Sequence, residues 1–364
     1  MSETTVLYDW HVGRDARMVA FAGYLLPVQY EGVLAEHKQC RTAAALFDTS
    51  HMGQLLFRGP DAAEQLDRLL TQGASRLDVG RGRYGFLLEP DGGVIDDAIV
   101  MRLDEEEFLL VVNAGTAAED REWVQSHLGG DVELTDLRAD GWAKIDLQGP
   151  AAFDVLARFA EFELRELRYF RCRRGRLDGR DGVVSRTGYT GELGYEIMAP
   201  GEDIAALWDR LVADERVRPA GLGARDSLRL EMCLPLYGHE LSRERTPVEA
   251  GLTTFLGEHE FIGAPAVRAR MESGADERLI AFRSNSRRRA MVGNDIVAGG
   301  RTVGTVTSGA FSPMLGVSIG MGYVKAGLGQ PGTELTVDTG RAELEVAVAE
   351  RPLYTEGSCR KKLT

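Results

Sequence analysis

The chain has 364 residues, of which 44% are hydrophobic, and its formal net charge is −13. This hydrophobic fraction is typical of a globular protein with a substantial core, and the length is enough for two or three domains. The acidic charge argues against nucleic-acid binding, which depends on neutralising phosphates. No apolar run reaches the roughly 18 residues that cross a bilayer, so we expect no membrane partner.

The N-terminal stretch and the cysteines indicate the compartment. The first residues, MSETTVLYDWHVGRD, lack a basic segment followed by an apolar one, and their acids argue against a transit peptide. We therefore expect a cytoplasmic protein, or a mature chain of the mitochondrial matrix whose leader has been removed. Cys40, Cys172, Cys233 and Cys359 form no CxxC pair, and none has a histidine at zinc-ligand spacing. We expect free thiols and no metal.

A strand followed by Gly-Pro and an amphipathic helix occurs twice. The segment FRGPDAAEQLDRLL (57–70) resembles LQGPAAFDVLARFA (147–160). Gly-Pro ends the strand in each copy, and Pro60 or Pro150 suits the first helical turn. The leucines of the first copy and the apolar residues of the second lie at helical spacing. Two such units about 90 residues apart predict two related α+β modules.

Residues 83–103 predict a β-hairpin that carries two adjacent acids. Strand 83–89 leads into the turn Pro90-Asp91-Gly92-Gly93 and then into strand 94–103. Asp96 and Asp97 lie on opposite faces of this second strand, because side chains alternate along it. A buried, unpaired carboxylate is costly. Either the acids cap amides of the turn, or one is held in an apolar cleft, where its pKa is adjusted for a ligand nitrogen.

The remaining segments complete an α+β pattern. A strand at 107–114 and a helix from Thr116, as its cap, to His127 give the order β-α-β-β-β-α, unlike a doubly wound sheet. The second module has a strand pair within 182–199 and helices at 203–213 and 224–232. From 278 onward, short strands separated by glycines predict a small β-barrel or sandwich. No low-complexity linker separates the parts, so we expect them to pack closely.

Several polar residues have an unremarkable interpretation when each is taken alone. The chain contains no GxxxxGK[ST], HExxH or GxSxG motif. His51 is typical of a packed or hydrogen-bonded histidine, and Glu196 of a surface-facing strand residue. Arg225 suits an ion pair, and Asp226 suits the positive end of a helix dipole.

Eight strings change these interpretations when they are taken as a set. Together they resemble the T-protein family, the aminomethyltransferases of the glycine cleavage system, over about residues 7–354. Each string is weak alone, but the ordered set is highly specific. The strings are ARMVAFAGYLLPVQY, LFDTSHMGQLLFRGPDA, GGVIDDAIV, LLVVNAG, SRTGYTGELGYEI, GLGARDSLRLE, PLYGHEL and TSGAFSPMLGVSIGMGYV.

The resemblance implies an α+β fold of three domains arranged as a cloverleaf. Two antiparallel-sheet α/β modules and a small C-terminal β-barrel would surround a central folate cavity. The first domain would be discontinuous, formed by 1–50 and 141–270. The second, 51–140, would carry the strand with the two acids, and 271–364 would form the barrel.

The resemblance also implies a reaction. The enzyme would transfer the methylene of an aminomethyl group, carried on the lipoyl arm of H-protein, to tetrahydrofolate. The products would be ammonia, 5,10-methylene-tetrahydrofolate and the dihydrolipoyl arm. Tetrahydrofolate is thus the implied co-substrate, and lipoylated H-protein is the implied partner.

Site residues are implied position by position. Asp97 matches the carboxylate near the folate N10 nitrogen, with the reacting N5 close by, and is the implied catalytic residue. Glu196 matches the acid that binds the pterin ring, since a carboxylate can accept two N–H groups from its 2-amino edge. The other residues implied to line the folate cavity are Met52, Tyr84, Ile99, Asn113, Tyr189, Arg225 and, as a looser match, Tyr354.

Strand alternation then predicts the environment of each acid. Asp97 should face the cavity together with Ile95 and Ile99. Asp96 should point the other way and be held by backbone amides or a basic side chain.

Departures from the family pattern leave two alternatives open. Thr71-Gln72-Gly73 replaces the usual Thr-Asn-Asp, Asn113-Ala114-Gly115-Thr116 replaces NAAN, and segment 261–267 lacks a common lysine. These differences affect the H-protein docking surface and the donor more than the folate contacts. The alternatives are a stand-alone folate-dependent demethylase of a methylated small molecule and a folate-binding module without transfer activity. The Lys-Gly-Cys-Tyr type motif of such modules is missing.

Overall fold

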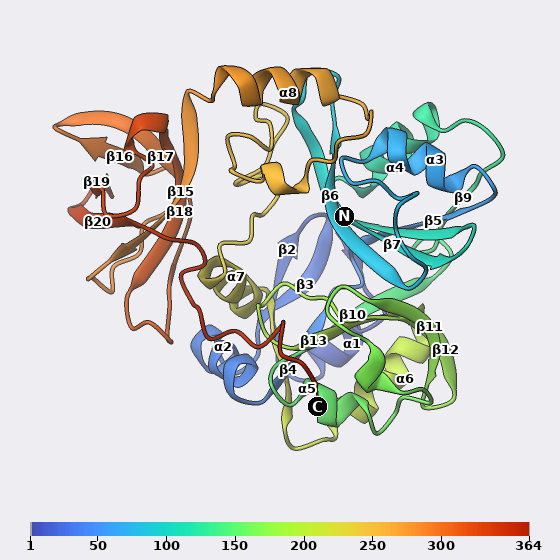
Figure 1. The fold of residues 1–364 in the computed structure, drawn as a ribbon. Coiled ribbons are helices and arrows are strands. Elements are labelled where there is room, and N and C mark those ends of the chain that lie inside the picture. Colours follow the sequence, from blue (N-terminus) through green and yellow to red (C-terminus); the bar gives the residue numbers. More distant parts are fainter. Residues whose placement is uncertain (1, 364) are drawn as a thin grey trace.

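A computed structural model describes residues 2–363. Three large β structures surround the middle of the molecule, and the C-terminal segment runs from the barrel back across it (Figure 1). Between the termini of this described part, no helix is long and apolar enough to cross a membrane.

The N-terminal part forms a small sheet and two helices. The three strands have the order β1-β3-β2, and β1 pairs parallel to β3. The elements are β1 (Glu3–Thr4), α1 (Tyr8–Val12), β2 (Arg17–Phe21), β3 (Tyr24–Gln29) and α2 (Val33–Thr42).

A six-stranded sheet combines chain segments that are far apart in the sequence. Its order is β11-β12-β13-β10-β4-β14, and all pairs are antiparallel except β14 with β4. Leu147, Tyr195 and Trp208 are among the residues of its core. The strands are β4 (Ala44–Asp48), β10 (Trp142–Gln148), β11 (Cys172–Leu177), β12 (Arg180–Ser185), β13 (Gly194–Pro200) and β14 (Val217–Pro219). The associated helices are α5 (Ala152–Leu156), η1 (Leu164–Glu166), α6 (Gly201–Val212) and α7 (Leu222–Glu231).

A five-stranded antiparallel sheet follows the predicted order β-α-β-β-β-α. Its strands are arranged β6-β7-β8-β5-β9, with α3 and α4 on one side (Figure 1). Thr116 is the N-cap residue of α4 and the helix ends at His127, both as predicted, but the Thr116 hydroxyl donates to the Asn113 carbonyl at 3.2 Å and caps no amide. The elements are β5 (Gly53–Arg58), α3 (Ala62–Leu69), β6 (Arg81–Leu88), β7 (Val94–Asp104), β8 (Glu107–Val112), α4 (Ala117–His127) and β9 (Glu133–Asp136).

A β-bulge interrupts the hairpin of β6 and β7. Asp96 pairs with Leu87 and Val94 pairs with Leu88, so Ile95 has no partner residue. Such an extra residue breaks the regular alternation. Ile95 therefore packs in the core with Ala98 and Val100, and the prediction that it faces the cavity is wrong.

The C-terminal part is the predicted small barrel. Six strands close in the order β15-β18-β17-β16-β19-β20 around a separate apolar core. α8 (Ala264–Ser273) and η2 (Thr253–Phe255) precede it. The barrel elements are β15 (Glu277–Ser284), β16 (Asp295–Ala298), β17 (Arg301–Phe311), β18 (Ser318–Lys325), η3 (Ala326–Leu328), β19 (Glu334–Asp338) and β20 (Glu343–Ala349).

The two Gly-Pro segments adopt the same backbone conformation. Gly59 has φ 139° and Gly149 has φ 137°, a region that favours glycine. A Cβ on Gly149 would lie 2.8 Å from the Cys40 carbonyl oxygen. The helices begin at Ala62 and Ala152, so both prolines precede the first helical turn instead of opening it.

We propose that the chain forms three domains: residues 1–50 together with 141–270, residues 51–140, and residues 271–364. Each part contains the strands of one large β structure, and the small N-terminal sheet belongs to the first. The antiparallel sheets, the accompanying helices and the closed barrel together confirm the α+β class.

Candidate active site

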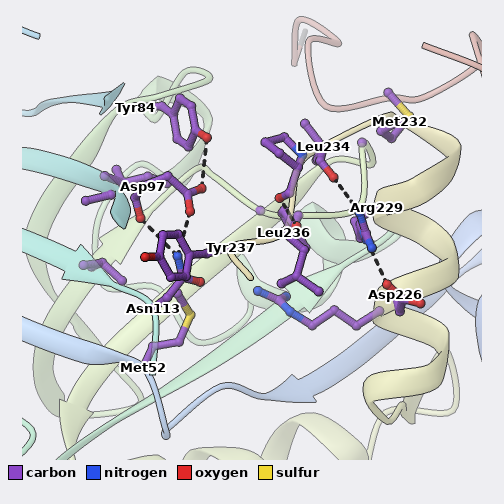
Figure 2. A pocket seen from close by; sticks show the side chains of 18 of the residues that line it. Met52, Tyr84, Asp97, Asn113, Asp226, Arg229, Met232, Leu234, Leu236 and Tyr237 are labelled. Carbon is purple, nitrogen blue, oxygen red and sulfur yellow. Dashed lines mark hydrogen bonds and ion pairs between the residues drawn. The ribbon is translucent and has the colours of Figure 1, made fainter. Parts of the chain in front are cut away.

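A cavity of about 1520 Å³ lies where the large β structures meet. Its volume exceeds the roughly 300–1,000 Å³ of an ordinary small-molecule pocket, which leaves room for a long ligand or two reactants. Segments from β6, β7 and α7 contribute to its wall (Figure 2), and so does the C-terminal end of the chain. All nine predicted site residues line it: Met52, Tyr84, Asp97, Ile99, Asn113, Tyr189, Glu196, Arg225 and Tyr354.

Asp97 lies in the cavity wall with both carboxylate oxygens hydrogen-bonded. The Tyr84 hydroxyl donates to Oδ2 at 2.9 Å, and the Asn113 side-chain amide donates to Oδ1 at 2.8 Å (Figure 2). Burial, followed by the charge of Asp96, raises the pKa of Asp97 to about 7, although both hydrogen bonds oppose the rise. A carboxyl group with this pKa can change its protonation state near neutral pH.

Asp96 is fully buried and has a different environment from its neighbour. The backbone N–H of Asn113 donates to Oδ2 and the Asn113 side chain donates to Oδ1, both at 2.8 Å. Asp96 is not part of the cavity wall. The expectation that a backbone amide holds it agrees with this geometry, and Asn113 therefore bridges the two acids.

A second polar cluster fixes Glu196 at the cavity wall. Lys144 Nζ lies 2.8 Å from Glu196 Oε1 and 2.5 Å from Asp146 Oδ1, and the Thr187 hydroxyl donates to Glu196 Oε2 at 2.5 Å. Glu196 is only 5% exposed, so its interpretation as a surface residue is wrong. Sequence reasoning had no signal for Lys144, which comes from the neighbouring strand β10.

Arg225 joins this cluster from α7. Its Nη1 lies 2.9 Å from Asp146 Oδ2, so the expected ion pair is present, and its guanidinium lies 4.9 Å from the centre of the Tyr189 ring. Burial pushes the pKa of Asp146 upward, but Lys144 and Arg225 outweigh it and hold that pKa below its usual value. The cluster therefore favours an ionised Asp146 in a fully buried position.

The other predicted residues form the wall around these groups. Met52 and Ile99 pack against one buried apolar cluster. Tyr354 lies in the C-terminal segment, where its backbone N–H donates to the Glu231 carbonyl at 2.9 Å. Its ring stacks under the Arg41 guanidinium at 4.3 Å.

Sequence reasoning missed several residues of the wall. His51 is packed as expected, but it also lines the cavity, and burial lowers its pKa to about 4, so the imidazole is neutral. Asp226 faces the cavity and pairs with Arg229 at 2.8 Å (Figure 2). Tyr237 lies in the string PLYGHEL, which was a signal for it, whereas nothing marked Tyr169 or Arg360.

The site can hold a polar ring and place an adjustable carboxylate beside it. Glu196 offers a fixed acceptor, and the aromatic side chains of Tyr84, Tyr189 and Phe255 offer flat surfaces. Within residues 2–363, no cluster of three or more His, Cys, Asp or Glu side chains could hold a metal ion. All four cysteines are free.

Comparisons with known proteins agree along nearly the whole chain. One family model, described as the GCVT N-terminal domain, matches residues 7–259, and the glycine cleavage T-protein C-terminal barrel domain matches 278–355. An aminomethyltransferase of Rubrobacter xylanophilus is 42% identical over 353 residues, which cover 96% of this chain and 91% of that protein. One of Geobacillus kaustophilus is 40% identical over 361 residues, covering 97% and 99%.

A solved structure extends this agreement to three dimensions. The glycine cleavage system aminomethyltransferase T of Bartonella henselae superposes with a TM-score of 0.93 at 34% identity, covering 98% of this chain and 99% of that one.

Proposed function

The chain belongs to the glycine cleavage T-protein family of aminomethyltransferases, and from this premise we propose a tetrahydrofolate-dependent reaction for it. The methylene of an aminomethyl group on the lipoyl arm of H-protein is transferred to tetrahydrofolate. Ammonia leaves, the sulfur returns as a dihydrolipoyl thiol, and 5,10-methylene-tetrahydrofolate forms. The bacterial origin of the relatives supports a cytoplasmic location.

The residues of the cavity fit a reduced folate. Glu196 presents a carboxylate that Lys144 holds in place through an ion pair at 2.8 Å, and a carboxylate can accept N–H bonds from a 2-amino-pyrimidine edge. Tyr84 and Tyr189 offer ring faces for a pterin or an aminobenzoyl group. Arg225 provides positive charge next to Tyr189.

The position of Asp97 carries the proposal. Two hydrogen bonds hold this carboxylate in the wall of the cavity, and its pKa near 7 lets it be ionised at physiological pH. Tetrahydrofolate supplies the N5 nitrogen that accepts the methylene. Asp97 orients that co-substrate and stabilises the positive charge that develops when ammonia leaves.

The volume of the cavity supports a second reactant. A site of about 1520 Å³ can admit the end of a long flexible arm while a folate occupies the rest. Bringing both reactants together in a partly dry cavity accounts for much of the rate enhancement in such transfers.

The proposal is tested by ammonia release from purified, aminomethylated H-protein. We expect release that depends on both tetrahydrofolate and this protein, with one methylene-tetrahydrofolate formed per ammonia. Parallel assays use methylated amines and sulfonium compounds as donors. Turnover of these donors, with no release from H-protein, would contradict the proposal.

A further inference from the structure

Asp120 is a buried acid that the reaction proposed above does not use. It lies in the first turn of α4, is 0% exposed, and finds no hydrogen-bond donor for either carboxyl oxygen among residues 2–363. An ionised carboxylate without a donor or a cation is costly to bury. The side chain therefore has either an unusual protonation state or an unusual role.

The charge that acts most strongly on Asp120 is that of the Asp96 carboxylate. The two groups lie within hydrogen-bonding reach of each other. Ionised carboxylates only accept hydrogen bonds, so a bond between them requires that one carries the proton.

The hydrogen bonds of Asn113 indicate which acid is ionised. Asn113 donates to Asp96 twice, from its backbone N–H and from its side-chain amide, both at 2.8 Å. The same amide nitrogen donates to Asp97 Oδ1 at 2.8 Å. An ionised Asp96 accepts these bonds better than a neutral one, so the proton belongs on Asp120.

We propose that Asp120 is a positioning residue, a neutral carboxylic acid that donates to Asp96 and thereby fixes Asn113 and Asp97. The inference rests on the proposed function, because Asp97 is its reacting carboxylate. The chain of contacts runs from Asp120 on α4 to Asp96 on β7, then to Asn113 at the end of β8, and back to Asp97. With its amide engaged by both acids, Asn113 has one favourable orientation.

The charged surroundings of Asp120 support its neutral form. Burial, followed by the charge of Asp96, raises the pKa of Asp120 to about 10, and Glu119 on the same helix adds to the rise. Burial raises the pKa of Tyr237, on the loop that follows α7, and this residue is near enough for Asp96 and Asp120 to add to the rise. Arg243, on the same loop, forms ion pairs with Glu89 and, at 3.1 Å, with Glu119.

Two effects act in the opposite direction. The N-terminal end of α4 favours a negative charge in its first turn, and the nearby Thr116 hydroxyl lowers the pKa of Asp120, although it donates to the Asn113 carbonyl. Both are smaller than the cost of a second negative charge beside buried Asp96.

Two substitutions separate a neutral Asp120 from an ionised one. Asp120→Asn keeps the shape, the lack of charge and an N–H donor for Asp96, whereas Asp120→Leu removes the donor. The matched control is Glu119→Gln, which removes an exposed charge from the same turn. For each variant, kcat/KM for ammonia release is measured as a function of pH, and the pH at which it falls on the acid side (the acid limb) is compared. Tetrahydrofolate affinity is measured as well.

We expect Asp120→Asn and Glu119→Gln to keep the acid limb of the wild type and kcat within about twofold. In Asp120→Leu, Asp96 takes up a proton more readily, so Asp97 loses its charged neighbour and the limb moves down by about one pH unit. We expect kcat to fall about tenfold with tetrahydrofolate affinity nearly unchanged. A downward shift in Asp120→Asn would overturn the proposal, because it would show that a negative charge had been removed.

A measurement without turnover tests the proton directly. Carbon-13 NMR of aspartate-labelled wild type, with Asp120→Asn for assignment, should show a protonated Asp120 carboxyl at pH 8. An ionised carboxyl there overturns the proposal even if Asp120→Leu does not fold. If no ammonia is released under any condition, the proposed function fails, while the NMR result still decides the state of Asp120.

Discussion

Two adjacent residues of one strand acquire different chemistry from their surroundings. Asp96 is enclosed and satisfied by Asn113, whereas Asp97 faces the cavity and is held by Asn113 and Tyr84. The pKa of Asp97 rises to about 7 chiefly because it is removed from water. A group that is half-buried beside another acid is well suited to respond to a bound cation or amine.

We expect Asp97→Asn to lose most turnover while binding tetrahydrofolate within about tenfold of the wild type, or about 1.4 kcal/mol. The amide keeps the size of the side chain but cannot carry the negative charge that the reaction requires. Steady-state ammonia release and a folate titration measure the two quantities. Full activity in this variant would remove Asp97 from the mechanism.

Asp97 should also make stability depend on pH. Its folded pKa of about 7 lies above the unfolded value near 3.9, so the folded state binds more protons between these two pH values. Stability should therefore fall as pH rises from 4 to 8, by roughly 1–3 kcal/mol relative to Asp97→Asn. Urea denaturation at both pH values measures this difference, with the exposed Asp140→Asn as the control. An equal pH dependence in wild type and Asp97→Asn would contradict the raised pKa.

At the scale of elements, a β-bulge and a repeated Gly-Pro turn shape the strands around the site. The β-bulge at Ile95 removes that residue from the side of β7 that faces the cavity and turns it into the core. The repeated Gly-Pro segments join a strand to a helix in two sheets, with nearly equal φ angles at Gly59 and Gly149. The repetition in the sequence thus corresponds to a repeated backbone requirement.

We expect Gly149→Ala to destabilise the protein by about 2 kcal/mol or more. A side chain at φ 137° is strained and would contact the carbonyl oxygen of Cys40. Gly141→Ala is the matched control, because Gly141 has φ 85° but no atom within 4 Å of an added Cβ. Chemical denaturation of both variants separates steric clash from backbone strain, and equal losses would argue against the clash.

At the scale of the whole molecule, the C-terminal segment runs from the barrel to the six-stranded sheet (Figure 1). Residues of this segment between Pro352 and Arg360 also line the cavity. Ser358 bonds the Glu192 carboxylate, and the Cys359 backbone N–H donates to the Gly191 carbonyl at 3.0 Å. Arg186 donates to the carbonyls of Cys359 and Lys361. The cavity is thus complete only when distant parts of the chain are assembled.

We expect a chain that ends at Tyr354 to bind tetrahydrofolate at least about tenfold more weakly. Its three β structures should remain, since residues 355–363 belong to no strand. Circular dichroism checks the fold, and fluorescence titration measures folate affinity. A chain that ends at Lys361 keeps the anchoring carbonyls and serves as the control. Unchanged affinity in the shorter chain would show that the segment contributes nothing to binding.

Much of the architecture could be predicted because it depends on local patterns. Alternation and turn residues identified the hairpin of β6 and β7, helical spacing identified α3 and α5, and glycine-separated strands identified the barrel. The ordered family strings also led to nine residues that line one cavity. A local pattern does not encode which distant groups meet. The strand pattern around Glu196 therefore suggested a surface residue, because it gave no sign of the Lys144 side chain that pairs with it.

The sequence by itself determined the elements, the family and the candidate residues, because these follow from short-range periodicity and from motifs in a fixed order. Only the tertiary structure decided the environment of each acid. The bulge at Ile95 and the bridge from Asn113 to both Asp96 and Asp97 depend on how consecutive strands pair, and the ion pair of Lys144 with Glu196 joins two strands that are distant in the chain. Burial and neighbouring charge set the chemistry of a carboxylate, and both arise when those strands come together.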